Sequence, residues 1–169
     1  MVAAVQAVKT PFAPLRKKQR KKTTMTKIMF VCHGNICRSP MAEFMFKDLI
    51  TKAGREEEFE VASSAVSTEE IYRGVGSPVY PPAKAELKKH GIFCEGKRAR
   101  LLTEEDGEYY DLFLCMDESN LRRAKRILGE KNGYKCRKLL EDREVADPWY
   151  SGNFERTYED ILEGIKKLL

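Results

Sequence analysis

Hydrophobic positions along this chain alternate between short apolar runs and longer amphipathic stretches. Four compact apolar runs are typical of buried strands: 27–32, 59–66, 111–116 and 135–140. Five stretches predict helices, four by apolar residues at helical spacing and one by a Thr-x-x-Asp capping pattern: 39–53, 83–90, 118–128, 154–169 and 103–109. Strands that alternate with helices predict right-handed crossovers and a parallel sheet covered on both faces, which is an α/β fold.

Composition and charge divide the chain into a tail and one domain. The 169 residues carry a net charge of +5, with 42% hydrophobic and 34% charged residues, as in a globular protein. Residues 1–24 hold seven of the 31 Lys and Arg and no acidic residue, which leaves 24 basic against 26 acidic residues in 25–169. We therefore predict a disordered basic tail over 1–24 and a single, slightly acidic domain over 25–169. Because the excess of basic over acidic residues lies entirely in the tail, the net charge of the chain is weak support for a nucleic-acid partner.

Cysteine and histidine usage exclude several classes of protein. The five cysteines are Cys32, Cys37, Cys94, Cys115 and Cys136. An odd number without a secretory signal pattern argues against a disulfide framework and for the cytoplasm. The spacing lacks paired Cys-x-x-Cys units, and His33 and His90 are the only histidines, so we expect no metal site. The longest apolar run, 28–32, is too short to span a membrane.

The connection between the first strand and the first helix, residues 31–40, reads Val-Cys-His-Gly-Asn-Ile-Cys-Arg-Ser-Pro. Successive backbone N–H groups at such a helix N-terminus can face inward and bind an anion. Gly34 permits a close approach of the backbone to a ligand, and Asn35 tolerates left-handed geometry. Ser39 is predicted to cap the helix, and Pro40 suits its first turn.

Cys32 and Arg38 add reactive groups to this loop. A helix N-terminus and a guanidinium stabilise a thiolate, and the planar fork of Arg38 matches two phosphate oxygens. Together they predict nucleophilic attack on a phosphoryl group with a phosphocysteine intermediate. Cys-x5-Arg alone is a weak signal, whereas Cys-x-Gly-Asn-x-Cys-Arg-Ser-Pro between a strand and a helix is specific.

This longer string, followed by Met-Ala-Glu at 41–43, resembles the signature of the low-molecular-weight protein tyrosine phosphatases. The resemblance extends over residues 25–169. It implies a Rossmann-like three-layer αβα fold with a four-stranded parallel sheet, and hydrolysis of phosphotyrosine without a cofactor. In that chemistry Cys32 is the nucleophile and Arg38 binds the phosphoryl oxygens.

The resemblance assigns further roles residue by residue. Asp147, in the sequence Asp-Pro-Trp-Tyr, matches the general acid and base, and Trp149 and Tyr150 match aromatic residues beside the phosphotyrosine slot. Cys37 matches a second thiol that forms a reversible disulfide with the nucleophile. Ser64 is expected to support the loop with its hydroxyl. The remaining substrate-binding residues that we expect are His33, Gly34, Asn35, Ile36, Cys37 and Ser39.

Two stretches depart from the family pattern. Where many members have an aromatic wall after the second strand, this chain has Glu69, and Tyr72 in an apparent insertion is a second candidate for the wall. Where many members have a histidine before Ala-Arg, this chain has Lys97 or Arg98, so the support of the phosphate loop is expected to differ.

Three other functions remain open at this point. An arsenate reductase on the same fold needs two further cysteines a short distance apart, whereas Cys94 and Cys115 are 21 residues apart. A protein-arginine phosphatase carries Thr where Ile36 stands. A phosphate-binding module without turnover would not need a nucleophile, an arginine and an acid together, and this chain has all three.

The resemblance also bears on partners. It implies a phosphotyrosine-containing protein as the substrate, with a bacterial tyrosine kinase as one candidate. We expect a cytoplasmic monomer with neither a nucleic-acid partner nor a membrane partner.

Overall fold

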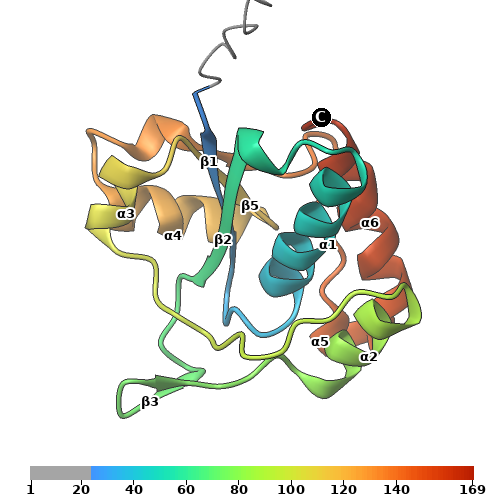
Figure 1. Cartoon of the computed structure of the whole chain (residues 1–169). Helices are drawn as coiled ribbons and strands as arrows, with labels where there is room; N and C mark the ends of the chain where they lie inside the picture. The colour runs from blue at the N-terminus through green and yellow to red at the C-terminus, as the bar shows by residue number, and fades with distance from the viewer. Residues whose placement is uncertain (1–23) are drawn as a thin grey trace, which may run out of the picture.

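Four parallel strands form the central sheet of the computed structural model, which describes residues 24–169 (Figure 1). The predicted tail lies outside the described residues except for Thr24. The strand order is β2-β1-β5-β6, and every neighbouring pair is parallel, as the alternation of strands and helices predicted. The four strands are β1 (Thr26–Cys32), β2 (Phe59–Ala65), β5 (Leu112–Cys115) and β6 (Cys136–Lys138).

Helices cover both faces of this sheet and complete three layers (Figure 1). One face is covered by α1 (Arg38–Lys52) and α6 (Phe154–Lys166), with α2 (Pro81–Lys89) packed against both. The other face is covered by α4 (Glu118–Leu128), with α3 (Glu104–Tyr109) packed against it. Two short 3₁₀ turns precede strands of the sheet: η1 (Glu56–Glu58) comes before β2, and η2 (Gly133–Lys135) comes before β6.

Strand β1 lies inside the protein on both of its faces. Ile28 and Phe30 point into the core beneath α1 and α6, whereas Met29 and Val31 point into the core beneath α4. Successive side chains of a strand alternate between faces, so a strand with two covered faces must be apolar throughout. This burial explains the uninterrupted apolar run from which the strand was predicted.

The segment between β2 and α2 contains a small antiparallel hairpin. Its strands are β3 (Ile71–Tyr72) and β4 (Val75–Gly76), and Arg73 and Gly74 at the turn both have positive φ angles. The hairpin projects from the end of the molecule where the strands of the sheet terminate (Figure 1). Two-residue strands carry too few positions to show an alternating pattern, which is why the sequence did not predict them.

One prediction about a helix start was wrong, and one short helix was not predicted. Helix α1 begins at Arg38 with Cys37 at the N-cap position, and the Ser39 side chain makes no cap bond because it is used in the active-site loop. A four-residue helix, α5 (Pro148–Ser151), was not predicted, and Asp147 caps it by accepting a hydrogen bond from Trp149 N.

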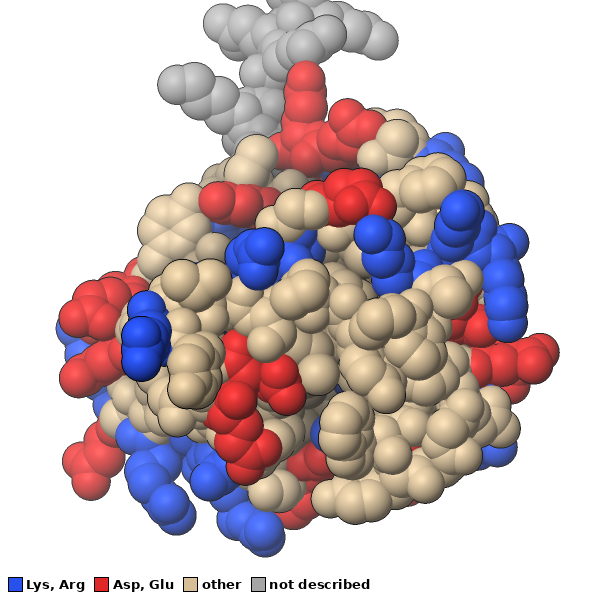
Figure 2. Space-filling view, turned by 90° about the horizontal axis from the view of Figure 1, so that it is seen from below, with Lys and Arg blue, Asp and Glu red and all other residues tan. Residues whose placement is uncertain are grey.

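The topology places a crevice at the carboxyl end of β1. The chain runs from β1 to β2 on one side and then returns to β5 on the other side, so β1 is the switch point of the sheet. Ligands of such sheets bind beyond the strand ends at this point. Figure 2 looks onto this end of the molecule and shows acidic side chains gathered near its middle, with basic side chains at the lower left and at the upper right. Among residues 24–169, no helix is both long and apolar enough to cross a membrane.

Candidate active site

A cavity of about 520 Å³ opens where β1 ends. It is lined by the loop that follows β1, by residues 69 and 70, by the start of α4 and by the segment that leads into α5. Nine of the eleven site residues expected from the sequence line it: Cys32, His33, Gly34, Ile36, Cys37, Arg38, Asp147, Trp149 and Tyr150. The other two, Asn35 and Ser39, are buried behind the loop and contact the Cys32 sulfur.

Backbone hydrogen bonds orient the loop around this cavity. The carbonyl oxygens of Cys32, His33 and Ile36 accept hydrogen bonds from the amides of Val66, Ser67 and Tyr80, respectively. A trans peptide directs its C=O and N–H to opposite sides, so the N–H groups that follow these carbonyls point the other way. Asn35 has a φ angle of 59°, in the left-handed region, as its role in a tight turn predicts. The loop therefore has the arrangement of an anion nest.

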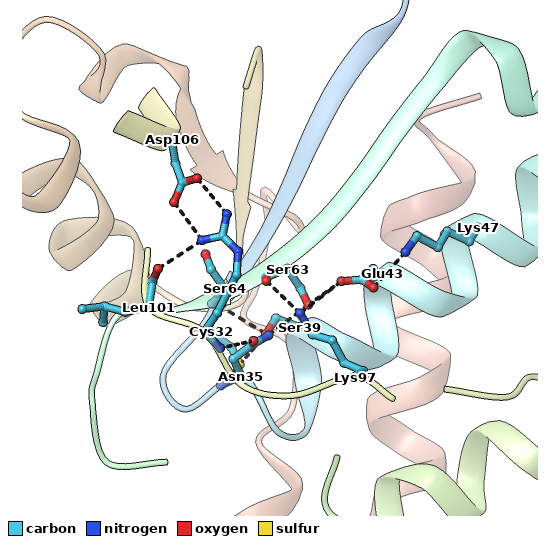
Figure 3. A network of polar contacts seen from close by, with 11 residues as sticks. Cys32, Asn35, Ser39, Glu43, Lys47, Ser63, Ser64, Lys97, Leu101 and Asp106 are labelled. Carbon is cyan, nitrogen blue, oxygen red and sulfur yellow. Dashed lines mark hydrogen bonds and ion pairs between the residues drawn. The ribbon is translucent and has the colours of Figure 1, made fainter. Parts of the chain in front are cut away.

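Hydrogen-bond donors surround the Cys32 sulfur. Asn35 N donates to Cys32 Sγ at 3.3 Å, and Ser39 Oγ lies 2.9 Å from the same sulfur. Asn35 Nδ2 donates to Ser39 Oγ at 2.8 Å and to Ser63 Oγ at 2.9 Å (Figure 3). The supporting hydroxyl thus comes from Ser63 rather than from Ser64 as predicted, because the two adjacent residues point to opposite faces of β2. Ser64 Oγ is buried without a hydrogen-bond partner.

Arg38 is held in one position beside the cysteine. Its side chain is 4% exposed; Nη1 lies 2.9 Å from Asp117 Oδ2 and donates to Val145 O at 3.3 Å, and Nη2 lies 3.4 Å from Asp147 Oδ2. Burial on its own would lower the pKa of Arg38, but the negative charges of Cys32, Asp147 and Asp117 outweigh it and raise that pKa. The guanidinium therefore stays charged and is oriented before any ligand arrives.

Asp147 lies across the cavity on a segment that α6 holds in place. Ala146 N donates to Asp160 Oδ2 at 3.0 Å, and Thr157 Oγ1 donates to Ala146 O at 2.8 Å. The Asp147 side chain is 33% exposed, so one carboxylate oxygen faces Arg38 while the group stays within reach of solvent. A carboxyl group at this place can exchange protons with a bound ligand and with water.

The outer wall of the cavity is acidic where many family members are aromatic. Glu69 lines the cavity and its Oε2 lies 2.9 Å from His33 Nε2, while His33 Nδ1 lies 3.3 Å from Arg123 Nη1. Tyr72, the other candidate for this wall, is 79% exposed on the hairpin and does not contribute to the lining. The aromatic residues of the lining are therefore Trp149 and Tyr150 on the opposite side, with Trp149 packed against Tyr80 at 5.3 Å between ring centroids.

The second thiol of the loop, Cys37, is buried close to negative charges. Burial, followed by the neighbouring charges of Cys32 and Asp147, raises the pKa of Cys37 to about 12. Cys37 is therefore a neutral thiol at physiological pH. All five cysteines are free in the structure.

Comparison with known proteins agrees with this geometry. A model of the family "Low molecular weight phosphotyrosine protein phosphatase" matches residues 27–169. The chain belongs to this family.

Individual members of the phosphatase family support the assignment. The low molecular weight protein-tyrosine-phosphatase YfkJ of Bacillus subtilis is 36% identical over 151 residues, which cover 86% of this chain and 94% of YfkJ. The crystal structure of YfkJ superposes with a TM-score of 0.78 at 34% identity, covering 86% of this chain and 92% of that structure. Vibrio vulnificus Wzb in complex with benzylphosphonate has a TM-score of 0.73 at 26% identity, covering 85% of this chain and 97% of that structure.

Sequence reasoning missed several residues that line the cavity, and Asp117 is the one that contacts Arg38. It ends the connection after β5, caps α4 by accepting a hydrogen bond from Asn120 N, and lines the cavity beside Arg38. An Asp that precedes a helix is already a cap signal, which the sequence displays. Its second role depends on β5 lying next to β1, and this neighbourhood is visible only in the fold. Among residues 24–169, no group of three or more His, Cys, Asp or Glu side chains is arranged to hold a metal ion.

Proposed function

We propose that the protein hydrolyses phosphotyrosine in other proteins through a phosphocysteine intermediate on Cys32. The observation that carries this proposal is the position of the Cys32 sulfur in a cavity that also holds the fixed guanidinium of Arg38 and the carboxylate of Asp147. Thiolate, guanidinium and loop amides suit a phosphoryl group, and a carboxyl group near its leaving oxygen supplies the proton. The names of the relatives, and the benzylphosphonate bound to Vibrio Wzb, support the same chemistry.

The reaction follows in two steps. Cys32 Sγ attacks phosphorus, the bond from phosphorus to the tyrosine oxygen breaks, and Asp147 donates a proton to that oxygen. Asp147 then takes a proton from water, the water oxygen attacks phosphorus, and the sulfur–phosphorus bond breaks to release inorganic phosphate. Arg38 and the loop amides bind the phosphoryl oxygens in both steps, where they stabilise the developing negative charge.

The remaining walls fit a flat aromatic leaving group. Ile36 on one side and Trp149 and Tyr150 on the other supply apolar surface above the phosphate loop. We further propose a reducing, cytoplasmic location, because all five cysteines are free. We also propose a bacterial tyrosine kinase as one candidate for the substrate protein. We propose that the protein itself is a monomer.

Asp147→Asn tests the proposed acid. For a phosphotyrosine peptide we expect kcat/KM, which reports the first step alone, to fall about 10²-fold, because the tyrosine oxygen is a poor leaving group unless it is protonated. For p-nitrophenyl phosphate, whose leaving group is stable as an anion, the loss should stay below about tenfold. Both rates are measured in EDTA, with Asp142→Asn as a control, since Asp142 is an exposed acid of the same segment. Equal losses on the two substrates contradict the role of Asp147, and faster turnover of a phosphoarginine peptide contradicts the substrate class.

We also propose that Cys37 protects Cys32 from irreversible oxidation. Both thiols line the cavity, and the raised pKa of Cys37 keeps it protonated, so Cys32 is the thiol that peroxide attacks first. The resulting sulfenic acid is attacked by the Cys37 sulfur, which releases water and forms the disulfide. After hydrogen peroxide, dithiothreitol should restore most activity of the wild type and little of Cys37→Ser. Mass spectrometry that finds no Cys32–Cys37 linkage in the recoverable protein contradicts this proposal.

A further inference from the structure

Lys97 is a largely buried cation behind the phosphate loop. Its side chain is 12% exposed, and its Nζ donates to Ser63 O at 3.0 Å and lies 3.4 Å from Glu43 Oε1 (Figure 3). Arg98, the other candidate for this place, points away and donates to Gly76 O in the hairpin. Burial lowers the pKa of Lys97, and the charge of Glu43 offsets part of that effect. A buried ammonium group is costly unless it is paired, so its position needs an explanation.

Glu43 connects this cation to the loop. The carboxylate is 4% exposed; Oε1 accepts a hydrogen bond from Ser63 Oγ at 2.8 Å, and Oε2 accepts one from Lys47 Nζ at 3.0 Å. An ionised carboxylate only accepts hydrogen bonds, so the Ser63 hydroxyl proton must point to Glu43. The Ser63 oxygen is then left with its lone pairs toward Asn35 Nδ2.

The direction of these hydrogen bonds continues to the cysteine. Asn35 Nδ2 uses its two protons on Ser63 Oγ and Ser39 Oγ, and Asn35 Oδ1 accepts from Arg100 N at 3.1 Å, which fixes the amide orientation. Because Ser39 Oγ accepts from Asn35, its own proton is free for Cys32 Sγ at 2.9 Å, while the competing acceptor Ser64 O is 3.5 Å away. The chain of bonds ends in an O–H donor aimed at the thiolate.

We propose that Lys97 is a positioning residue for the Cys32 thiolate and acts through Glu43 and Ser63. It holds Glu43 Oε1 facing Ser63, so that Ser63 Oγ turns its lone pairs to Asn35 Nδ2. Ser63 Oγ and Arg100 N together then hold the amide that makes Ser39 Oγ a donor to Cys32. This inference rests on the proposed role of Cys32 as nucleophile. The charged groups that line the cavity around Cys32 are not part of this chain of bonds: Arg38, Glu69, Glu70, Asp117 and Asp147.

Lys97→Met is the variant that tests this role, and iodoacetamide alkylation of Cys32, followed by peptide mass spectrometry over a range of pH, is the readout. We expect the rate at mildly acidic pH to fall about threefold to tenfold and the profile to move to higher pH, because a hydrogen bond to a charged group weakens. The value of kcat/KM for phosphotyrosine peptide should fall by the same factor. Lys47→Met is the matched control: Lys47 pairs with the other oxygen of Glu43 but is 45% exposed, so water replaces it and the change should stay below about twofold.

Two further variants separate positioning from simple stability. Lys97→Gln keeps a donor for Ser63 O without the charge, so it should shift the alkylation profile as Lys97→Met does, even where the latter folds poorly. The double variant with Glu43→Gln should lose no more than Glu43→Gln alone, because both act through one route. An unchanged alkylation profile in folded Lys97→Gln, or fully additive losses, overturns the proposal. Failure of the proposed function is a separate outcome. It would appear as turnover that survives the single substitution Cys32→Ser, in a chain that keeps Lys97.

Discussion

Replacing Cys32 by serine should abolish turnover. We expect kcat for phosphotyrosine peptides to fall by about 10⁴-fold or more, the scale of loss seen when a covalent nucleophile is removed from a hydrolase. A serine hydroxyl at this place stays protonated, and within residues 24–169 the hydrogen-bond partners at Cys32 Sγ are Asn35 N and Ser39 Oγ, neither of which is a base. These donors stabilise a negative sulfur and do nothing to remove a proton from an alcohol.

Binding should survive this substitution. The loop amides and Arg38 are unchanged in Cys32→Ser, so inorganic phosphate should still bind, measured by calorimetry, within a few-fold of the wild type. Cys94→Ser is the control for loss of a buried thiol, because Cys94 is 3% exposed and lies outside the cavity lining. It should keep most of the activity at a lower melting temperature. Activity of Cys32→Ser near that of Cys94→Ser contradicts the assignment of the nucleophile.

Arg38→Lys should have the second largest effect, a fall in kcat/KM of about 10³-fold. Lysine keeps the positive charge, but a single ammonium cannot reproduce the fork that holds two phosphoryl oxygens while it stays fixed on Asp117 at 2.9 Å and on Val145 O at 3.3 Å. Because lysine has a single side-chain nitrogen, a contact with the phosphoryl oxygens also leaves Asp117, which is 18% exposed, without its ion-pair partner.

The measurement for Arg38→Lys is steady-state kinetics with inhibition by phosphate. Both KM and the inhibition constant should rise, because the arginine contacts oxygens in the ground state and in the transition state. Arg98→Lys is the control, since Arg98 is exposed and its side chain donates to Gly76 O, away from the cavity lining. A loss in Arg38→Lys of less than about tenfold is incompatible with a guanidinium that binds the phosphoryl group.

The sequence was sufficient for the parts of this protein that are encoded locally. Buried strands such as β1 show as apolar runs because both faces are covered, and the active-site loop is contiguous from residue 32 to residue 39. Asp147 lies far along the chain, yet its Asp-Pro-aromatic-aromatic context identified it through the family resemblance. These features need no knowledge of which segments meet in space.

Contacts between distant segments could not be predicted in the same way. The Arg38–Asp117 pair joins residues 79 apart, and Lys97 reaches Ser63 across 34 residues. The choice between Ser63 and Ser64 depended on the register of β2, because one residue reverses the face to which a strand side chain points. The Ser39 hydroxyl was predicted as a helix cap from local preference, but the nearby thiol and the Asn35 amide take both of its hydrogen bonds.

The central claim is that Cys32 carries the phosphoryl group between two steps. Rapid acid quench of the wild type and of Asp147→Asn tests it directly during turnover of p-nitrophenyl phosphate, whose first step this substitution should slow little. Peptide mass spectrometry follows, under conditions that preserve thiophosphate esters. We expect phosphate on the peptide that contains Cys32, in larger amount in Asp147→Asn because activation of water in the second step is slowed, and none in Cys32→Ser. Phosphate on any other residue, or turnover at the full rate with no phosphorylated Cys32 at any quench time, would contradict the account.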